Sequence, residues 1–354
     1  MRIVDLRSDT VTLPTSEMLE AMRTAPLGDD VYREDPTVNR LEELAAKKMG
    51  KEAALLTTSG TQANLVSALS QTKRGEEVIL EADAHMYYYE GTFSALSGLI
   101  PRLVKGQRGI MTPKEIGSAL RPPDIHFPPT SLVCIENTHN RAGGTVWTPS
   151  QIKAVFDFAH SRGLKVHMDG ARIFNAAIAQ NIDVKELTQF ADSMMFCLSK
   201  GLSAPIGSLA VGEREFIDSA RRYRKMLGGG MRQAGVIAAA GIIAIEKMID
   251  RLKDDHANAQ ILAKGLMSID GIAIDPTQVQ TNIVVYDVSG LGIDGERWVT
   301  KLNESGVKAG TLEAGRVRMV THRGIEKHDI EYALSVAEKT AQGTRKNPKD
   351  GLSG

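Results

Sequence analysis

A series of short, continuous apolar runs separated by helical patterns constrains the fold of this chain most strongly. Each run is followed by small or polar residues, and the runs span 53–56, 77–80, 132–135, 164–168 and 193–198. Runs of this length that do not alternate with polar residues are typical of parallel strands buried on both faces. Because strands that alternate with helices form βαβ units, we predict an α/β chain with a mostly parallel sheet flanked by helices.

The helical segments between these runs carry start and stop signals. The segment 36–49 has apolar residues at helical spacing, with Pro36 at its start and Gly50 after its end. Thr148 and Pro149 begin a second helix, which Gly163 ends.

The pattern changes at about residue 211. A long, mostly helical stretch at 214–267 precedes segments of mixed type, which are β-like at 282–288 and 316–321 and helical at 295–305 and 326–339. We predict a large domain at 1–250 that includes an N-terminal arm, a smaller α+β domain at 251–341 and a flexible tail at 342–354. The arm could pack with either domain.

Composition excludes several classes of protein. Lys+Arg and Asp+Glu are 43 each, so the net charge is zero and argues against a nucleic-acid binder. No apolar run approaches the roughly 20 residues needed to cross a bilayer, and the N-terminus has no apolar signal stretch. Cys134 and Cys197 both lie in apolar runs, so we interpret them as reduced core residues of a cytoplasmic protein and expect no metal site.

Two motifs that follow apolar runs could bind a ligand. Ser59, Gly60 and Thr61 precede a helical pattern at 65–69. The N–H groups of such a helix start can bind an anion, although Ser59 or Thr61 could simply cap the helix. Asp169 directly follows the run 164–168 and should therefore lie at the sheet edge where ligands bind in parallel sheets. Like Ser59 or Thr61, Asp169 could instead merely cap the next helix.

A lysine completes the set. Lys200 follows the run 193–198, where burial is costly unless the amine has a use such as a Schiff base. The alternative is a lysine whose ammonium reaches solvent at the sheet edge. A helix start, an acid and a lysine in this order fit pyridoxal 5′-phosphate (PLP), which needs a phosphate cradle, a carboxylate for its ring nitrogen and an amine for its aldehyde. His85 is a candidate to cover the ring.

Several longer and mutually different motifs occur along residues 3–340, at 5–12, 28–32, 59–64, 136–140, 169–176, 198–202 and 228–233. The first has the sequence Asp-Leu-Arg-Ser-Asp-Thr-Val-Thr and the last Gly-Gly-Gly-Met-Arg-Gln. On these motifs the chain resembles the low-specificity L-threonine aldolases, PLP-dependent lyases of the aspartate-aminotransferase fold.

The resemblance implies roles in cofactor binding. Lys200 would form the Schiff base, Asp169 would pair with the ring nitrogen, and His85 would stack on the ring. The remaining implied cofactor contacts are Gly60 and Thr61 at the phosphate, Arg172 near the ring oxygen or the substrate carboxylate, and Lys225, Arg232 and Tyr32 at the phosphate of a neighbouring subunit. A shared site implies at least a dimer, and the family is usually tetrameric.

The resemblance also implies the substrate contacts. Ser8, Arg172 and Arg318 would bind the carboxylate of a small amino-acid substrate, with Arg316 as the alternative to Arg318. His126 would contact the substrate hydroxyl together with His85. His167 is expected to face away from the neighbours of Asp169 and to have a core or supporting role.

The implied reaction is reversible cleavage of L-threonine, L-allo-threonine and related L-β-hydroxy-α-amino acids to glycine and an aldehyde such as acetaldehyde. The base that takes the hydroxyl proton could be His85, His126 or a bound water. The same cofactor also serves aminotransferases, racemases and β-eliminating lyases, and these remain the alternatives.

Overall fold

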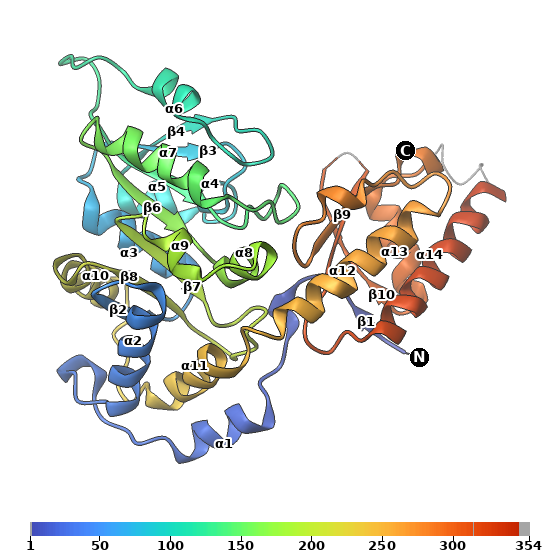
Figure 1. Ribbon diagram of the computed structural model, residues 1–354, viewed down its shortest axis with the longest axis horizontal. Coiled ribbons are helices and arrows are strands. Elements are labelled where there is room, and N and C mark those ends of the chain that lie inside the picture. The colour runs from blue at the N-terminus through green and yellow to red at the C-terminus, as the bar shows by residue number, and fades with distance from the viewer. Residues whose placement is uncertain (1, 314, 347–354) are drawn as a thin grey trace. The chain divides into compact units, whose positions relative to one another are not determined.

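The computed structural model describes residues 2–313 and 315–346. The chain divides into two compact units (Figure 1). One unit comprises Leu13–Asp250, and the other joins the residues up to Thr12 to the segment that begins at Arg251. Residues 1–12 were predicted to belong to the large domain, whereas residues 2–12 group with the C-terminal unit.

The large unit is built on a seven-stranded sheet with the order β2-β8-β7-β6-β5-β3-β4. Its strands are β2 (Ala53–Thr57), β3 (Glu77–Glu81), β4 (Ile100–Val104), β5 (Thr130–Glu136), β6 (Lys165–Asp169), β7 (Ser193–Cys197) and β8 (Ser208–Gly212). Only β8 is antiparallel to its neighbours, β2 and β7, so the sheet is mostly parallel. The α/β fold and all five strands that the apolar runs predicted are confirmed.

Two strands of this sheet were not predicted. β4 is an edge strand that contains Pro101 and Arg102 and is largely exposed, so it has no continuous apolar run. The apolar part of β8 is short and lies between Gly207 and Gly212, which makes it resemble a turn.

Helices cover the sheet of the large unit (Figure 1). They are α1 (Ser16–Thr24), α2 (Pro36–Met49), α3 (Gly60–Gln71), α4 (His85–Tyr88), α5 (Thr92–Ser97), α6 (Pro113–Ala119), α7 (Pro149–His160), α8 (Ile173–Gln180), α9 (Val184–Thr188), α10 (Arg214–Met226) and α11 (Gly235–Lys247). α3 packs against β6, β7 and β8, which places its N-terminus beside the centre of the sheet.

The two helices predicted from their end signals form as expected. The Asp35 carboxylate accepts hydrogen bonds from the N–H groups of Thr37 and Val38 at the start of α2, and Gly50 ends α2 with a φ of 65°. Thr148 and Gln151 form a capping box at the start of α7. The long helical stretch predicted at 214–267 is in fact three helices, α10, α11 and α12 (Leu252–Met267).

The C-terminal unit is α+β, as predicted. It contains the antiparallel sheet β11 (Gly310–Thr311), β12 (Arg316–Val320) and β9 (Ile283–Asp287), together with α12, α13 (Gly295–Glu304) and α14 (Lys327–Lys346). β1 (Val4–Asp5) pairs in parallel with β10 (Val307–Lys308), which ties the N-terminal residues to this unit. Of the predicted tail, residues 342–346 continue α14, and residues 347–354 lie outside the described residues.

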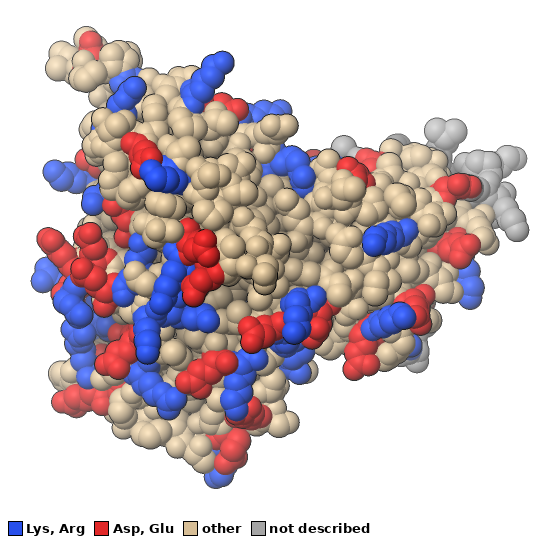
Figure 2. Space-filling model, in the orientation of Figure 1, with Lys and Arg blue, Asp and Glu red and all other residues tan. Residues whose placement is uncertain are grey.

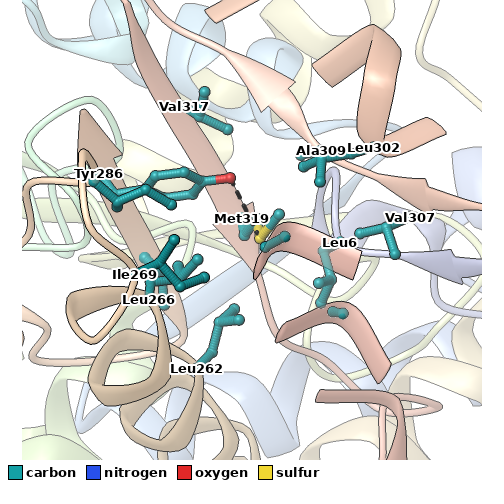
Figure 3. Packing of buried hydrophobic residues seen from close by; sticks show 14 of the residues in the cluster. Leu6, Leu262, Leu266, Ile269, Tyr286, Leu302, Val307, Ala309, Val317 and Met319 are labelled. Carbon is teal, nitrogen blue, oxygen red and sulfur yellow. Dashed lines mark hydrogen bonds between the residues drawn. The ribbon is translucent and has the colours of Figure 1, made fainter. Parts of the chain in front are cut away.

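The core of the C-terminal unit lies between these helices and strands (Figure 3). Leu6 from the N-terminal segment packs with Leu262 and Leu266 of α12 and with Met319 of β12. Trp298 Nε1 donates a hydrogen bond to Tyr286 Oη over 2.9 Å, so both buried polar groups have a partner. Burial of Val4 and Leu6 in this core explains why the N-terminal residues group with this unit.

The surface and the cysteines agree with the composition. Figure 2 shows basic and acidic side chains interspersed on the face in view. Cys134 and Cys197 are both free and buried, as predicted. No helix among the described residues is long and apolar enough to span a membrane.

Candidate active site

The carboxyl ends of the parallel strands bring the predicted functional residues of the large unit together. Asp169 is the last residue of β6 and lies opposite Glu136 of β5 and Met195 of β7 in the strand register. Lys200 follows the end of β7, and His85 follows β3 at the start of α4. Loops that leave parallel strands at the same edge converge there.

Asp169 is a buried carboxylate with two hydrogen-bond donors. Its Oδ1 accepts from the N–H of Ala171 over 3.0 Å, and its Oδ2 accepts from Asn64 Nδ2 over 2.9 Å. Burial alone would favour the neutral acid, but the charges of His85 and Lys200 and these hydrogen bonds hold the pKa of Asp169 below its usual value. Asp169 therefore offers a buried negative charge at the sheet edge, and its contact with Ala171 also orders the start of the loop before α8.

His85 is held at both its backbone and its ring. Its N–H donates to Glu136 Oε2 over 2.7 Å, and its Nδ1 lies 2.9 Å from Glu90 Oε1. The Tyr89 ring is 5.2 Å away between centroids. Burial lowers the pKa of His85, but Glu90 and Asp169 more than offset that effect and raise it above the usual value.

Lys200 is half-buried in the loop between β7 and β8. Its carbonyl accepts a hydrogen bond from the N–H of Ser203 over 2.8 Å, and Ser203 is buried with a φ of 64°. This tight turn fixes the backbone from which the lysine side chain extends. The positive charge of Lys200 favours the ionised form of Asp169 and opposes protonation of His85, so the amine lies in the same electrostatic cluster.

The N-terminus of α3 forms the other part of the site. Ser59 caps the helix by accepting the N–H of Gln62, whereas the N–H groups of Gly60 and Thr61 precede the first helical hydrogen bond and are left for a ligand. A Cβ at Gly60 would lie 3.0 Å from the Met195 side chain and 3.1 Å from that of Cys197. Glycine therefore lets the helix start approach β7 closely.

Arg172 and the loop 227–234 complete the polar surroundings. Arg172 is buried at the N-terminal end of α8, and its guanidinium lies 3.5 Å from Asn140 Oδ1. Arg232 is exposed and donates to Asp29 Oδ2 over 2.9 Å. The loop itself passes close to α3, because a Cβ at Gly229 would lie 2.3 Å from the Gln62 amide.

Comparisons with known proteins identify the family of this chain. The model of the beta-eliminating lyase family matches residues 5–289. The probable low-specificity L-threonine aldolase 2 of Arabidopsis thaliana is 45% identical over 345 residues, covering 96% of this chain and 97% of that protein. The low specificity L-threonine aldolase of Escherichia coli (strain K12) is 44% identical, covering 93% and 96%. The chain belongs to the low-specificity L-threonine aldolase family. The family named from the sequence motifs is thus confirmed.

A solved structure supports the fold of this threonine aldolase family member. The Leishmania major threonine aldolase superposes with a TM-score of 0.81 at 19% identity, covering 95% of this chain and 99% of that one. At this identity the likeness concerns the fold alone.

His126 does not join the other predicted residues of the large unit. It lies in the loop between α6 and β5, its side chain is 77% exposed, and its ring nitrogen Nδ1 contacts Asp124. Among the described residues it has no contact with His85, Asp169 or Lys200. Its role at the substrate stays a prediction.

Lys225 and Tyr32 also lie at the surface of the large unit. The side chain of Lys225 packs close to Gly230, and Tyr32 is 70% exposed. The neighbouring Arg224, in contrast, is buried and binds Leu56 O and Asp30 Oδ2. Of the neighbouring cations Arg224 and Lys225, only Lys225 is therefore exposed and able to contact another molecule.

In the C-terminal unit, Ser8 and Arg318 lie near each other. Ser8 Oγ accepts the N–H of Thr10 over 3.2 Å, and the Arg318 guanidinium donates to the carbonyl of Arg7 over 3.2 Å. Arg316 is more exposed and lies opposite Asp287 in the strand register. This arrangement favours Arg318 over Arg316 as the partner of Ser8.

Sequence reasoning misjudged one residue and missed two. His167 was expected to face away from the surroundings of Asp169, but residues two apart on a strand share a face, and His167 Nε2 lies 3.1 Å from the Asn64 amide that binds Asp169. The expected core or supporting role of His167 is confirmed, since the residue is fully buried. Asn64 itself was quoted only as part of a motif. Glu90 was not considered, although a glutamate shortly after a candidate ring-stacking histidine is a signal that could have been followed.

Proposed function

We propose that this chain is a PLP-dependent aldehyde-lyase that cleaves L-threonine, L-allo-threonine and related L-β-hydroxy-α-amino acids reversibly to glycine and an aldehyde. The observation that carries the proposal is the clustering of Asp169, His85 and Lys200 at the carboxyl edge of the sheet. The 44–45% identity to low-specificity L-threonine aldolases over nearly the whole chain supports the substrate class.

The donor groups of the large unit fit PLP. The ionised Asp169 suits a protonated ring nitrogen, the N–H groups of Gly60 and Thr61 suit the phosphate, and the Lys200 amine suits the aldehyde. A side chain at position 60 would press on β7, which supports a helix start kept open for a ligand. When bound, PLP supplies an electron sink for the charge left on the substrate Cα.

The protein side chains orient the substrate and move its proton. Buried Arg172 can bind a carboxylate with its planar fork of donors, and Ser8 and Arg318 are further proposed ligands on the strength of the family resemblance. Fixing the carboxylate selects the Cα–Cβ bond for cleavage. His85 has a titrating ring beside Lys200 and is the described histidine of this cluster placed to take or hold the hydroxyl proton. His126 and a water molecule remain proposed alternatives.

Product analysis tests the reaction. Purified protein incubated with L-threonine should give glycine and acetaldehyde in equal amounts, with no keto acid and no D-allo-threonine. With a 2-oxo acid added as amino acceptor, 2-oxo-3-hydroxybutanoate would indicate an aminotransferase. D-allo-threonine would indicate a racemase that inverts Cα, and 2-oxobutanoate with ammonia would indicate a β-eliminating lyase. Any of these as the main product would overturn the proposed cleavage.

We further propose that the protein is a cytoplasmic homo-oligomer. Two subunits would share each pair of sites, and the complete assembly would be a tetramer. Exposed Arg232 and Tyr32, and the exposed Met226 at the end of α10, support a contact surface. The two free buried cysteines support a reducing compartment. Mixed oligomers of Arg232→Ala and Lys200→Ala subunits should regain activity that neither variant has alone. No recovery in oligomers shown to be mixed would refute site sharing.

A further inference from the structure

A buried glutamate that the proposed chemistry does not use lies within the site. Glu90 is 3% exposed, and its Oε1 is 2.9 Å from both His85 Nδ1 and Asn64 Nδ2. A buried carboxylate is costly unless it is paired or hydrogen-bonded. Glu90 contacts His85 directly and is linked to Asp169 through Asn64. His85 and Asp169 are two groups that the proposed function needs.

Asn64 separates the two buried acids. Its Nδ2 donates one hydrogen to Glu90 Oε1 and the other to Asp169 Oδ2, each over 2.9 Å. One ligand atom from each of His85, Glu90 and Asp169 lies within 4.8 Å of the others, a spacing that a metal ion could also bridge. The amide of Asn64 already donates to both carboxylates, so this cluster is a hydrogen-bonded one rather than a cation site.

A chain of hydrogen bonds fixes the orientation of the Asn64 amide. Gln71 Nε2 donates to the Ser67 carbonyl and to Ser193 Oγ, and a carbonyl can only accept. His167 Nδ1 lies 2.8 Å from Ser193 Oγ, and its Nε2 lies 3.1 Å from Asn64 Oδ1. Because Glu90 and Asp169 both accept from Asn64 Nδ2, the amide oxygen of Asn64 is the atom that faces His167.

A His167 ring that carries a single proton can make its contacts with both Ser193 and Asn64. Burial lowers the pKa of His167 to about 4, so its ring is neutral near pH 7. Asn64 therefore presents its two N–H groups, and not its oxygen, to Glu90 and Asp169.

The proton between Glu90 and His85 has two possible positions. Burial and the charge of Asp169 raise the pKa of Glu90, whereas the hydrogen bonds from His85 and Asn64 favour its ionised form. His85 is the more exposed partner, with 31% of its side chain accessible, and the charges facing its ring are Glu90, Asp169 and Lys200. Two acids against one lysine favour the proton on the imidazole.

We propose that Glu90 is a positioning residue that accepts the Nδ1 proton of His85 and thereby leaves Nε2 as the nitrogen that faces the reaction. In this tautomer a neutral His85 carries a lone pair on Nε2, and among the described residues that nitrogen has no hydrogen-bond partner. The ring can then accept a proton from a ligand. The use of that nitrogen in turnover rests on the proposed function, but the tautomer itself does not.

Neutron diffraction from deuterium-exchanged crystals of the wild-type protein tests the tautomer directly. Deuterium on Nδ1 of His85, alone or together with Nε2, is the expected result because Glu90 accepts in both cases. Deuterium on Nε2 alone would mean that Glu90 donates, and would overturn the proposal. This measurement needs no variant and no assumption about substrate.

The Glu90→Gln variant tests the charge. The rate at which diethyl pyrocarbonate modifies His85, followed by peptide mass spectrometry against pH, reports the pKa of that ring in solution. An opposite charge at this distance is worth about one pH unit or more, so Glu90→Gln should lower the His85 pKa by about that amount. Glu90→Asp, which keeps the charge, should restore part of the shift.

Glu81→Gln is the matched control. Glu81 is also buried at the end of β3 and accepts from a histidine, His139 Nε2, over 3.0 Å. Its loss should leave the pKa of His85 unchanged. An equal shift in both glutamine variants, or none in Glu90→Gln, would refute the proposal.

A kinetic measurement links the tautomer to turnover. With L-threonine, Glu90→Gln should lower kcat at least tenfold with little change in KM, since general acid–base catalysis contributes about 10²–10⁴. If the protein proves not to cleave threonine, the diffraction and modification results still decide the role of Glu90. Wild-type kcat together with the expected tautomer would confine Glu90 to structure and refute its positioning role.

Discussion

Replacing Asp169 by asparagine tests the electrostatic reading of the site most directly. The carboxylate uses its two oxygens differently, one for the Ala171 N–H and one for Asn64 Nδ2. An asparagine that keeps the Ala171 contact turns its own NH2 toward Asn64 Nδ2, so two donors would meet across a distance that is now 2.9 Å. Rotation of the Asn64 amide would not compensate, because it would turn the amide oxygen toward Glu90 Oε1, which now accepts from Nδ2.

The cost to stability follows from this geometry. An unpaired buried donor costs about 1–3 kcal/mol, partly offset because a buried charge has been removed. We expect the variant to fold with a modestly lower Tm.

The cost to activity should be larger. A unit charge about 4 Å from a protonated ring nitrogen is worth roughly 4 kcal/mol at an effective dielectric constant near 20, which corresponds to about a thousandfold in rate. Steady-state kcat/KM with L-threonine at saturating PLP measures this loss, and PLP titration separates it from weaker binding. An activity within about threefold of wild type in Asp169→Asn would remove Asp169 from the cofactor site.

Three further variants probe the rest of the large unit. Lys200→Ala should abolish turnover and the absorbance of the lysine-linked cofactor, and persistence of that absorbance would assign the link to another lysine. His126→Ala should change the ratio of kcat/KM for L-threonine and L-allo-threonine while PLP stays bound, whereas equal losses accompanied by loss of PLP would indicate a structural role. The Glu81–His139 pair should stabilise the fold most between about pH 5 and 6. Because the pKa of Glu81 is lowered, this group stabilises the fold above pH 4.5, and that stability is lost in acid. Because the pKa of His139 is raised, this group stabilises the fold below pH 6.5, and that stability is lost in base. Chemical unfolding of wild type and Glu81→Gln against pH should therefore differ most in that window, and a difference that grows above pH 8 would contradict this sign.

The sequence predicted the parts of the fold that local pattern determines. The strands β2, β3, β5, β6 and β7 are buried on both faces, so each appears as a continuous apolar run. β4 was not predicted because an exposed edge strand has no continuous apolar run. The grouping of Val4 and Leu6 with the C-terminal unit depends on pairing with Val307 and Lys308, a contact across the chain that no local pattern contains.

The candidate site shows the same division. Asp169 and Lys200 could be found because each follows a recognisable buried strand. Glu90 could not be weighed in the same way, since its burial becomes tolerable only when Asn64, 26 residues earlier in the chain, donates to it. His126 shows the opposite case, because the resemblance assigns a substrate role to a residue whose side chain is 77% exposed and contacts Asp124.

One helix nevertheless connects the predicted and the unpredicted parts of the site. Along α3, Gly60, Asn64, Ser67 and Gln71 follow one another at spacings of four, three and four residues, so they lie on one face. That face packs against β6 and β7. Its first residue lets the helix start approach β7, its second donates to Glu90 and Asp169, and its last donates to Ser193 Oγ. A buried polar group is costly unless it has a partner. The amides of Asn64 and Gln71 have partners, whereas the buried Ser67 hydroxyl has none among the described residues. The requirement for partners explains why the amide of Asn64, rather than an apolar residue, occupies the second turn of α3.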